Sequence, residues 1–387
     1  MGYVAVKGGT KAIEESLRRI QYERLKHGRT LDIRDIQAGM RQLIDQVMSE
    51  SSVYSESLAA LAIKQAEGSP EEAVFLLRAY RSTLARKHYS RTVTSDQMRV
   101  ERRISASFKD IPGGQMLGAT TDYSHRLLDF ELGDETEESV REWLAHFENG
   151  GEGSLEDASQ EDVRPEQAPH EQLPKVLDYL RREGLIPECP IDDAEPDDIT
   201  RKSLTFPASR SEKLQILSRG QTGAVTSLAY AVIRGYGNVH PTVGELRVGY
   251  LPVCVDSPLE AADSEEDAYY IGEIQVTEVE MVVPDTVDKR NGKKELQLDF
   301  GYGLCYGQNE TKAIAMSILD KSLAAGDKAI PTQNEEFVLF HIDSVESTGF
   351  ISHLKLPHYV TFQSKLNDIR KIRQAESAST EEENQYA

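Results

Sequence analysis

Cysteine is scarce in this chain of 387 residues, which contains only Cys189, Cys254 and Cys305. They are far apart, form no CxxC pair and leave an odd one over. We therefore expect neither a disulfide framework, nor a cysteine zinc site, nor an iron–sulfur cluster. No apolar run is long enough to span a bilayer. The first residues, MGYVAVKGG, lack the order of a secretion signal, so we expect a cytoplasmic protein without a membrane partner.

Basic residues are also few overall, because 44 Lys and Arg stand against 65 Asp and Glu, for a net charge of −21. The excess of acid is concentrated at 131–199, which holds 22 acidic and 5 basic residues. The segment 78–109 has the opposite balance, with nine basic residues and two acidic ones. We therefore expect no nucleic-acid partner, but a local field that attracts polyphosphates to 78–109.

The length of the chain leaves room for two or three domains. Residues 10–89 place apolar side chains at helical spacing, whereas 244–255 and 269–283 alternate with a period of two. We therefore predict an α+β protein, in which a helical N-terminal part precedes a mostly antiparallel sheet with packed helices. We expect a helical domain with a basic, glycine-rich segment at 1–130 and an acidic, partly disordered insertion at 131–199. An α+β domain at 200–374 and a disordered tail at 375–387 should follow.

Local signals predict individual elements within these parts. The sequence SPEE at 69–72 has the pattern of a helix start, with Ser69 as N-cap, Pro70 at the first helical position and Glu72 closing a capping box. We also expect a helix from Asn309 to about Leu323 and a strand at 336–342, EFVLFHI. The acid-rich stretch between the two alternating strands is predicted to be a hairpin loop.

The insertion at 131–199 contains two short helical stretches, EESVREWLAHF and LPKVLDYLRREG, among acidic and glycine-rich sequence. We interpret it as a solvated segment. The alternative is an acidic docking arm, anchored to a neighbouring protein by Trp143 and Leu144.

A glycine-rich turn follows the basic residues Arg102, Arg103 and Lys109 in RRISASFKDIPGGQMLG. Glycines let backbone amides approach an anion closely, and the basic side chains supply charge. The order of a P-loop is absent, and so is a dinucleotide fingerprint. The pattern predicts a triphosphate site, with a solvated helix face and an ordinary loop as the alternative.

Three carboxylates, Asp110, Asp122 and Asp129, lie close to that turn in the sequence, together with Tyr123 and His125. Cleavage of an N-glycosidic bond needs a carboxylate near the cationic sugar and a donor for the leaving base. The three are therefore candidate catalytic residues. The alternative is that Asp122 caps a helix and Asp129 faces solvent.

Two related motifs, RGYGNVHP at 234–241 and FGYGLCYG at 300–307, combine glycine with tyrosine in the sheet half. Glycine beside a strand often marks the close approach of a ligand or of another backbone, and tyrosine offers a stacking face. The two interpretations of these motifs are a site for purine stacking and ordinary bulges or turns of a sheet.

The segment ISHLKLPHYV presents His353 and His358 on either side of a predicted turn. Pro357 favours that turn, and only a turn brings two side chains at this spacing together. Two histidines leave a zinc shell incomplete, so His341, His240, a substrate oxygen or a partner must supply the remainder. The alternatives are a metal or phosphate site and two histidines that merely pack in a loop.

Several motifs together resemble one known family. The segments MGYVAVKGG, RRISASFKDIPGGQMLG, DYSHRLLDF, RGYGNVHPTVGELRVGY and GFISHLKLPHYVTFQ are similar to the PhnI subunits of bacterial carbon–phosphorus lyase. The resemblance covers nearly the whole chain outside about 131–190. It implies a cytoplasmic subunit of a core complex with PhnG, PhnH and PhnJ, associated with the ATP-binding-cassette proteins PhnL and PhnK.

The resemblance also implies an activity. In that family the subunit is a nucleosidase, which with its partners exchanges the adenine of MgATP for methylphosphonate and gives ribose 1-methylphosphonate 5-triphosphate. It further implies that the histidines of HLKLPH, here His353 and His358, bind Zn²⁺ near PhnJ. The roles of the arginines, Lys109 and the aspartates rest on local charge and chemistry alone. A non-catalytic scaffold that holds the lyase subunit and shares the zinc site is the alternative function, and a free-standing metal hydrolase is a weaker one.

Overall fold

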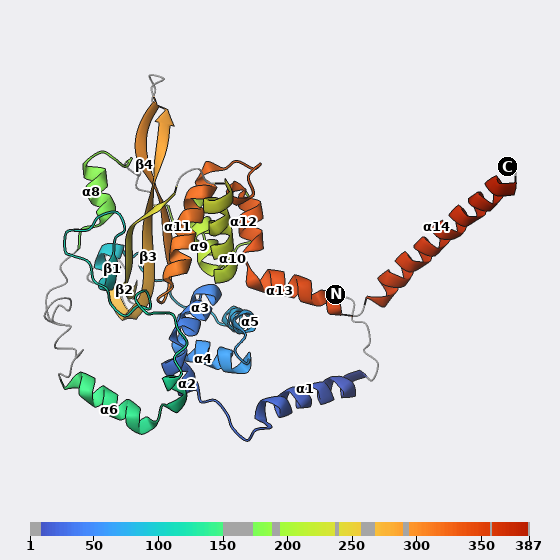
Figure 1. The fold of residues 1–387 in the computed structure, drawn as a ribbon, viewed down its shortest axis with the longest axis horizontal. Coiled ribbons are helices and arrows are strands. Elements are labelled where there is room, and N and C mark those ends of the chain that lie inside the picture. Colours follow the sequence, from blue (N-terminus) through green and yellow to red (C-terminus); the bar gives the residue numbers. More distant parts are fainter. Residues whose placement is uncertain are drawn as a thin grey trace.

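The computed structural model describes residues 9–149, 173–187, 194–236, 240–256, 268–288, 294–356 and 358–385. Its chain forms an N-terminal group of helices, a four-stranded antiparallel sheet with further helices, and a C-terminal arm (Figure 1). The predicted α+β class is confirmed. Within these ranges, no helix combines the length and the apolar character needed to cross a bilayer.

The N-terminal part is helical, as predicted. Its helices are α1 (Gly9–Leu25), α2 (Ile33–Gly39), α3 (Arg41–Ser51), α4 (Glu56–Gln65) and α5 (Pro70–Ser82). Helices α2 to α5 pack around a core of their own that includes Ile36, Val47, Ile63 and Val74. Helix α1 has no buried residue and lies outside that core.

The start of α5 is confirmed, with one correction. Ser69 is the N-cap, and its hydroxyl accepts a hydrogen bond from the backbone N–H of Glu72. The predicted capping box also requires a bond from the Glu72 carboxylate to the N–H of Ser69. That N–H instead donates to the carbonyl of Ala66, because the preceding helix ends immediately before the cap.

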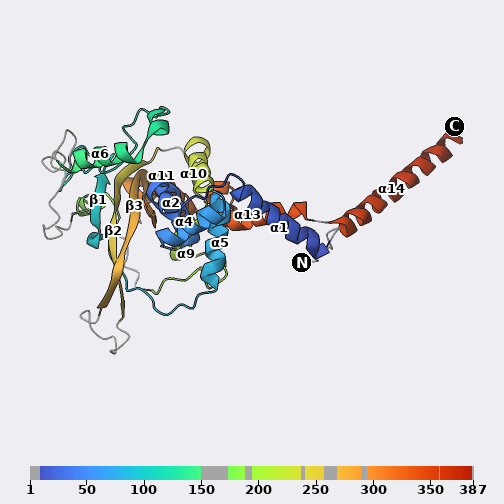
Figure 2. The same cartoon turned by 90° about the horizontal axis from the view of Figure 1, so that it is seen from below.

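The sheet has the strand order β1-β2-β3-β4 with antiparallel neighbours. Its strands are β1 (Arg99–Ile104), β2 (Thr242–Asp256), β3 (Ala268–Asp288) and β4 (Lys294–Tyr306). Helices α9 (Arg210–Arg219), α10 (Thr222–Ala231) and α11 (Glu310–Ala325) lie on one side of it (Figure 2). The predicted pair of alternating strands and the predicted helix after Asn309 are therefore confirmed.

The glycines of FGYG let α11 approach β4 closely. A Cβ atom at Gly301 would lie 2.0 Å from the carbonyl oxygen of Ser317, and one at Gly303 would lie 2.1 Å from that of Ala313. The two glycines of the motif thus serve the contact of two backbones. The other motif, RGYGNVHP, begins in the π-helical turn η3 (Val232–Tyr236). Its residues 237–239 lie outside the described residues.

The predicted strand EFVLFHI is wrong, because these residues form helix α12 (Glu335–His341). Asn334 caps the helix through a hydrogen bond from the N–H of Phe337, and two glutamates occupy its first turn. Val338, Leu339 and Ile342 are buried in the main core, which is the spacing of a helix face. The short one-turn helices η1 (Ser95–Gln97), η2 (Glu131–Asp134) and η5 (Pro331–Gln333) connect larger elements.

Both predicted helices of the acidic segment are present, as α6 (Glu137–Glu148) and α8 (Val176–Arg182). Helix α8 is not solvated, because Val176, Leu177 and Leu180 are buried against Val282 of the sheet. It covers the side of the sheet opposite α11 (Figure 1). Trp143 on α6 remains 61% exposed and stacks on Phe147. Residues 150–172 and 188–193 lie outside the described residues.

The C-terminal arm consists of α13 (Ser344–Ser352), the short helix η6 (His353–Lys355) and α14 (Tyr359–Gln385). Both views show α14 projecting away from the rest of the chain (Figures 1 and 2). Helix α14 continues through 375–385, within the segment for which the sequence predicts a disordered tail.

Candidate functional site

Arg103 is fully buried beneath the glycine-rich turn that follows β1. Its Nε donates to Glu245 at 2.5 Å, and its two Nη atoms donate to the carbonyls of Pro112 at 2.6 Å and Pro174 at 2.8 Å. These acceptors occupy the whole fork of the guanidinium group. Arg103 therefore fixes the turn and the start of α8 against the sheet. Its predicted role as a phosphate ligand stays a prediction.

Arg102 points to the other side of the sheet and is also buried. Its guanidinium donates to the carbonyl of Leu117 and to Asp122, each at 2.5 Å, and to Glu310 at 3.2 Å. Asp122 is 46% exposed, so one edge of the carboxylate pairs with the arginine while the rest is open to solvent. The structure thus joins one predicted phosphate ligand to one predicted catalytic carboxylate.

The other predicted residues of this region lie on the surface. Lys109, Asp110 and Asp129 are exposed, and among the described residues no ion pair links them to another predicted site residue. Asp129 accepts a hydrogen bond from the N–H of Glu131, which makes it a local turn residue. The roles predicted for these three residues stay predictions.

His353 and His358 come together at the bend between α13 and α14. Their ring centroids are 5.5 Å apart. Nδ1 of His353 contacts the carbonyl of Phe350, and Nδ1 of His358 contacts that of Leu356 at 2.5 Å. Such a contact sets the ring so that Nε2 is left as a ligand atom, as in most metal-binding histidines.

A wide cleft of about 1230 Å³ surrounds this histidine pair. His341 of α12 and Glu346 of α13 line it together with apolar residues such as Phe350 and Val360. Among the residues that the structure describes, no group of three His, Cys, Asp or Glu side chains could hold a metal ion. The histidine pair is short of the four ligands that a zinc shell usually takes, and within the described ranges the other predicted histidines do not extend it to a group of three.

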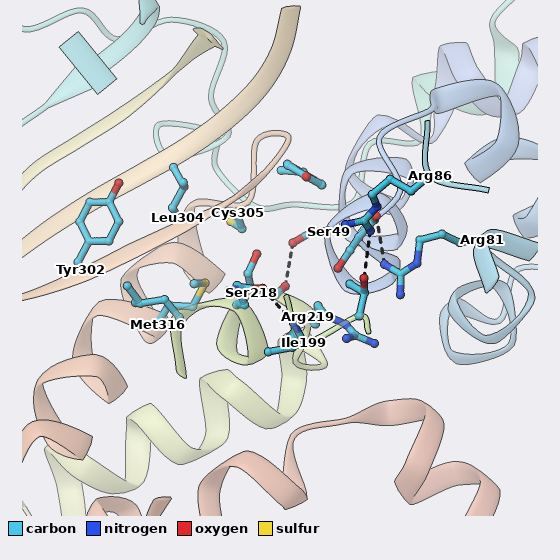
Figure 3. Close-up of a pocket in the computed structure, with 15 residues that line it drawn as sticks. Ser49, Arg81, Arg86, Ile199, Ser218, Arg219, Tyr302, Leu304, Cys305 and Met316 are labelled. Atoms are coloured by element: carbon cyan, nitrogen blue, oxygen red, sulfur yellow. Dashed lines mark hydrogen bonds between the residues drawn. The ribbon is translucent and has the colours of Figure 1, made fainter. Parts of the chain in front are cut away.

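A second pocket, of about 390 Å³, lies at the open edge of β4. We call it the arginine pocket, because three arginines from separate parts of the chain line it (Figure 3). They are Arg81 at the end of α5, Arg86 after that helix and Arg219 at the end of α9. The basic segment at 78–109 gave a signal for Arg81 and Arg86, but nothing in the sequence marks Arg219 as their neighbour.

A layer of buried charges lies on the sheet face opposite α11. Arg247 pairs with Glu278, and Lys175 pairs with Glu278 at 2.9 Å and with Glu280 at 3.1 Å. Burial alone would raise the pKa of Glu278, but Arg247 and Lys175 outweigh it and lower that pKa to about 2. Burial dominates at Glu280 and raises its pKa. These charges are compensated within the protein, so the layer stabilises the fold rather than forming an open site.

The sequence profile described as bacterial phosphonate metabolism protein (PhnI) matches residues 2–376 of the chain. The chain belongs to the PhnI family. The resemblance expected from the motifs is thereby confirmed over almost the whole chain, and it assigns the chain to bacterial phosphonate metabolism.

Similar proteins come from three bacteria. Two are named alpha-D-ribose 1-methylphosphonate 5-triphosphate synthase subunit PhnI. That of Escherichia coli K12 is 43% identical over 383 residues, with 97% of this chain and 99% of the relative covered. That of Rhizobium meliloti 1021 is 41% identical over 389 residues, with 97% and 96% covered. HtxH of Stutzerimonas stutzeri is 42% identical over 389 residues, with 99% of each chain covered.

Proposed function

We propose that the chain is the nucleosidase-type subunit of a carbon–phosphorus lyase and displaces adenine from MgATP with methylphosphonate. The N-glycosidic bond at the anomeric carbon breaks, a phosphonate oxygen bonds to that carbon, and adenine leaves after taking up a proton. The product is α-D-ribose 1-methylphosphonate 5-triphosphate. The observation that most supports this is the 43% identity to the E. coli synthase subunit over 97% of the chain.

Asp122 is the predicted carboxylate whose surroundings suit this chemistry best. Its ion pair with the buried Arg102 fixes the position of the carboxylate, while its exposed edge can face a ligand. A fixed carboxylate stabilises the positive charge that develops on the sugar as the leaving base departs. Asp110 and Asp129 lack such a partner among the described residues and remain less favoured candidates.

Zn²⁺ fits the pair His353 and His358. Two imidazoles bound to one tetrahedral zinc at about 2.0–2.1 Å have ring centroids roughly 5 Å apart, close to the observed 5.5 Å. The backbone carbonyls of Phe350 and Leu356 orient the rings for this role. A bound zinc would supply a Lewis acid or a structural link, with its further ligands coming from substrate or a partner.

The C-terminal arm supports a role within an assembly. Apolar side chains are exposed on it beside the histidine pair, including Phe350, Leu354, Val360 and Phe362. Such a surface is typical of an interface with another protein. We propose that partner subunits of the PhnG, PhnH and PhnJ type cover the arm, with PhnL- and PhnK-type proteins associated, and that one partner completes the zinc shell.

The proposed reaction is tested by chromatographic detection of free adenine. The chain, reconstituted with its partner subunits, is incubated with MgATP in the presence and absence of methylphosphonate. We expect adenine release that depends on the phosphonate. We also expect the Asp122→Asn variant to lose at least about 100-fold in rate, the lower end of a catalytic carboxyl's contribution. Asp134→Asn, an equivalent change at an exposed residue of η2, is the control.

Absence of adenine from a folded, complete complex would favour the scaffold function instead. The zinc proposal has a separate readout, the metal content of the complex. The double variant His353→Ala, His358→Ala should lose bound zinc, whereas His27→Ala at an exposed position should keep it. Phosphonate-dependent adenine release that survives in the double variant would assign the metal to a structural role or to a later step.

A further inference from the structure

The arginine pocket brings together more arginines than directly paired carboxylates among the described residues. Arg86 pairs with Asp198 and donates to Thr200 at 3.1 Å. Arg81 donates to backbone carbonyls, those of Ser51 at 3.0 Å and Ser52 at 3.4 Å. Nε of Arg219 is buried, and no described residue accepts a hydrogen bond from it. Of these three arginines, only Arg86 forms an ion pair within the described part of the chain.

The charged forms of two of these arginines are destabilised in the structure. Burial, followed by repulsion from Arg78 and Arg81, lowers the pKa of Arg219 to about 10. Burial, followed by repulsion from Arg78 and Arg86, also lowers the pKa of Arg81. An anion bound between Arg81 and Arg219 would raise the pKa of both, because an opposite charge favours the charged form of a base.

The two ends of the pocket differ in chemistry. The three arginines stand on one side, and Tyr302, Leu304 and Met316 stand on the other (Figure 3). The volume of about 390 Å³ falls within the usual range for small-molecule sites. A ligand that fits both ends carries several negative charges at one end and an apolar or aromatic group at the other.

We propose that the arginine pocket binds the phosphate chain of a nucleoside triphosphate through Arg81, Arg86 and Arg219, with the base directed toward Tyr302 and Leu304. Arginine suits this task because its planar fork binds phosphate oxygens in pairs. The proposal rests on the proposed function in that MgATP is the substrate there. It gives the triphosphate a site other than Arg103, whose donors are already occupied, and Arg102, whose guanidinium is paired with Asp122 and Glu310.

Calorimetric titration of the full chain, alone and in its reconstituted complex, tests the pocket. The ligands are MgATP, inorganic triphosphate and methylphosphonate, which separate a nucleotide from a bare polyphosphate and from the second substrate. We expect MgATP and triphosphate to bind at one site, with MgATP tighter. Arg219→Gln and Arg86→Gln should each weaken both by at least tenfold. Arg201→Gln removes the same charge at an exposed position whose guanidinium donates to Tyr89, and it should change affinity less than twofold.

Unchanged MgATP affinity in folded Arg219→Gln and Arg86→Gln proteins would overturn the proposal. Equal weakening of MgATP binding in Arg201→Gln would also overturn it, because it would show a general effect of net charge. So would a pocket that binds methylphosphonate but neither MgATP nor triphosphate. These results are distinct from failure of the proposed function. If the complex releases adenine and the pocket variants keep their affinity for MgATP, only the pocket proposal is rejected. If the pocket binds triphosphate tightly but the complex shows no phosphonate-dependent adenine release, only the proposed reaction is rejected.

Discussion

Arg103 of β1 and Arg219 of the arginine pocket are equally basic in the sequence but have opposite surroundings. Arg103 has an acceptor for each side of its guanidinium, and Glu245 neutralises it within the core. Arg219 has a buried Nε without an acceptor among the described residues and two arginines that repel it. A buried arginine with occupied donors stabilises the fold, whereas converging arginines with spare donors are suited to bind an anion.

The largest effect that tests this comparison is expected from Arg103→Met. The variant leaves Glu245 buried without its ion-pair partner and frees three further carbonyl contacts. We expect the free energy of unfolding to fall by about 3–5 kcal/mol, the usual cost of breaking a buried pair. Urea denaturation measures the change.

Arg99→Met on the same strand is the matched control. Arg99 is exposed and pairs with Glu101 at 3.3 Å and Glu273 at 3.0 Å, so its removal should cost about 0–1 kcal/mol. Equal losses in the two variants would mean that burial of Arg103 does not distinguish its role from that of a surface arginine.

Acid should weaken the buried charge layer. The pKa of Glu278 is about 2 in the folded protein, below its ordinary value of 4.5. The unfolded chain therefore takes up a proton first, and the stability that Glu278 provides is present above about pH 4.5 and is lost as pH falls toward 2. Urea denaturation between pH 6 and pH 3 should show this decline.

Glu280 provides an internal control of opposite sign. Its pKa is raised by burial, so protonation of this group favours the folded state as pH falls. The Glu280→Gln variant should therefore lose stability more steeply with acid than the wild type, and Glu278→Gln less steeply. Parallel pH profiles in all three proteins would contradict this assignment of charges.

Replacing a pocket arginine should have little effect on folding. Without ligand, Arg219→Gln should leave the free energy of unfolding within about 0.5 kcal/mol of wild type or raise it, because repulsion from Arg78 and Arg81 is relieved. Saturating MgATP should then stabilise the variant by about 1.4 kcal/mol less than the wild type if affinity falls tenfold. Thermal unfolding with and without MgATP measures both quantities. A large loss of stability without ligand would place Arg219 with Arg103 as a structural residue.

The smallest effect is expected from Lys109→Ala. Its side chain is exposed, so the free energy of unfolding should change by less than about 0.5 kcal/mol. We expect MgATP affinity to change less than twofold, since the triphosphate is assigned to the arginine pocket. A tenfold loss in the same calorimetric titration would instead favour the triphosphate site that the sequence predicts around the glycine-rich turn.

The course of the chain was largely predictable where local rules dominate. Helical spacing and the Ser69 cap identified the N-terminal helices, and alternation identified β2 and β3, because side-chain periodicity reflects which face is buried. The strand predicted at 336–342 failed because a short apolar run fits either element, and only the cap at Asn334 and the burial pattern decide for α12.

By itself the sequence determined the family, the α+β class and the close pairing of the histidines of HLKLPH, since each depends on residues that are near one another in the chain. Only the tertiary structure decided which charges are compensated. Two partners of Arg103, Glu245 and Pro174, and the arginine neighbours of Arg219 come from segments more than 60 residues away. Burial changes the energy of a charge far more than its position in the sequence does. A basic segment therefore identified a region of positive charge, while packing divided its arginines between the fold and a pocket.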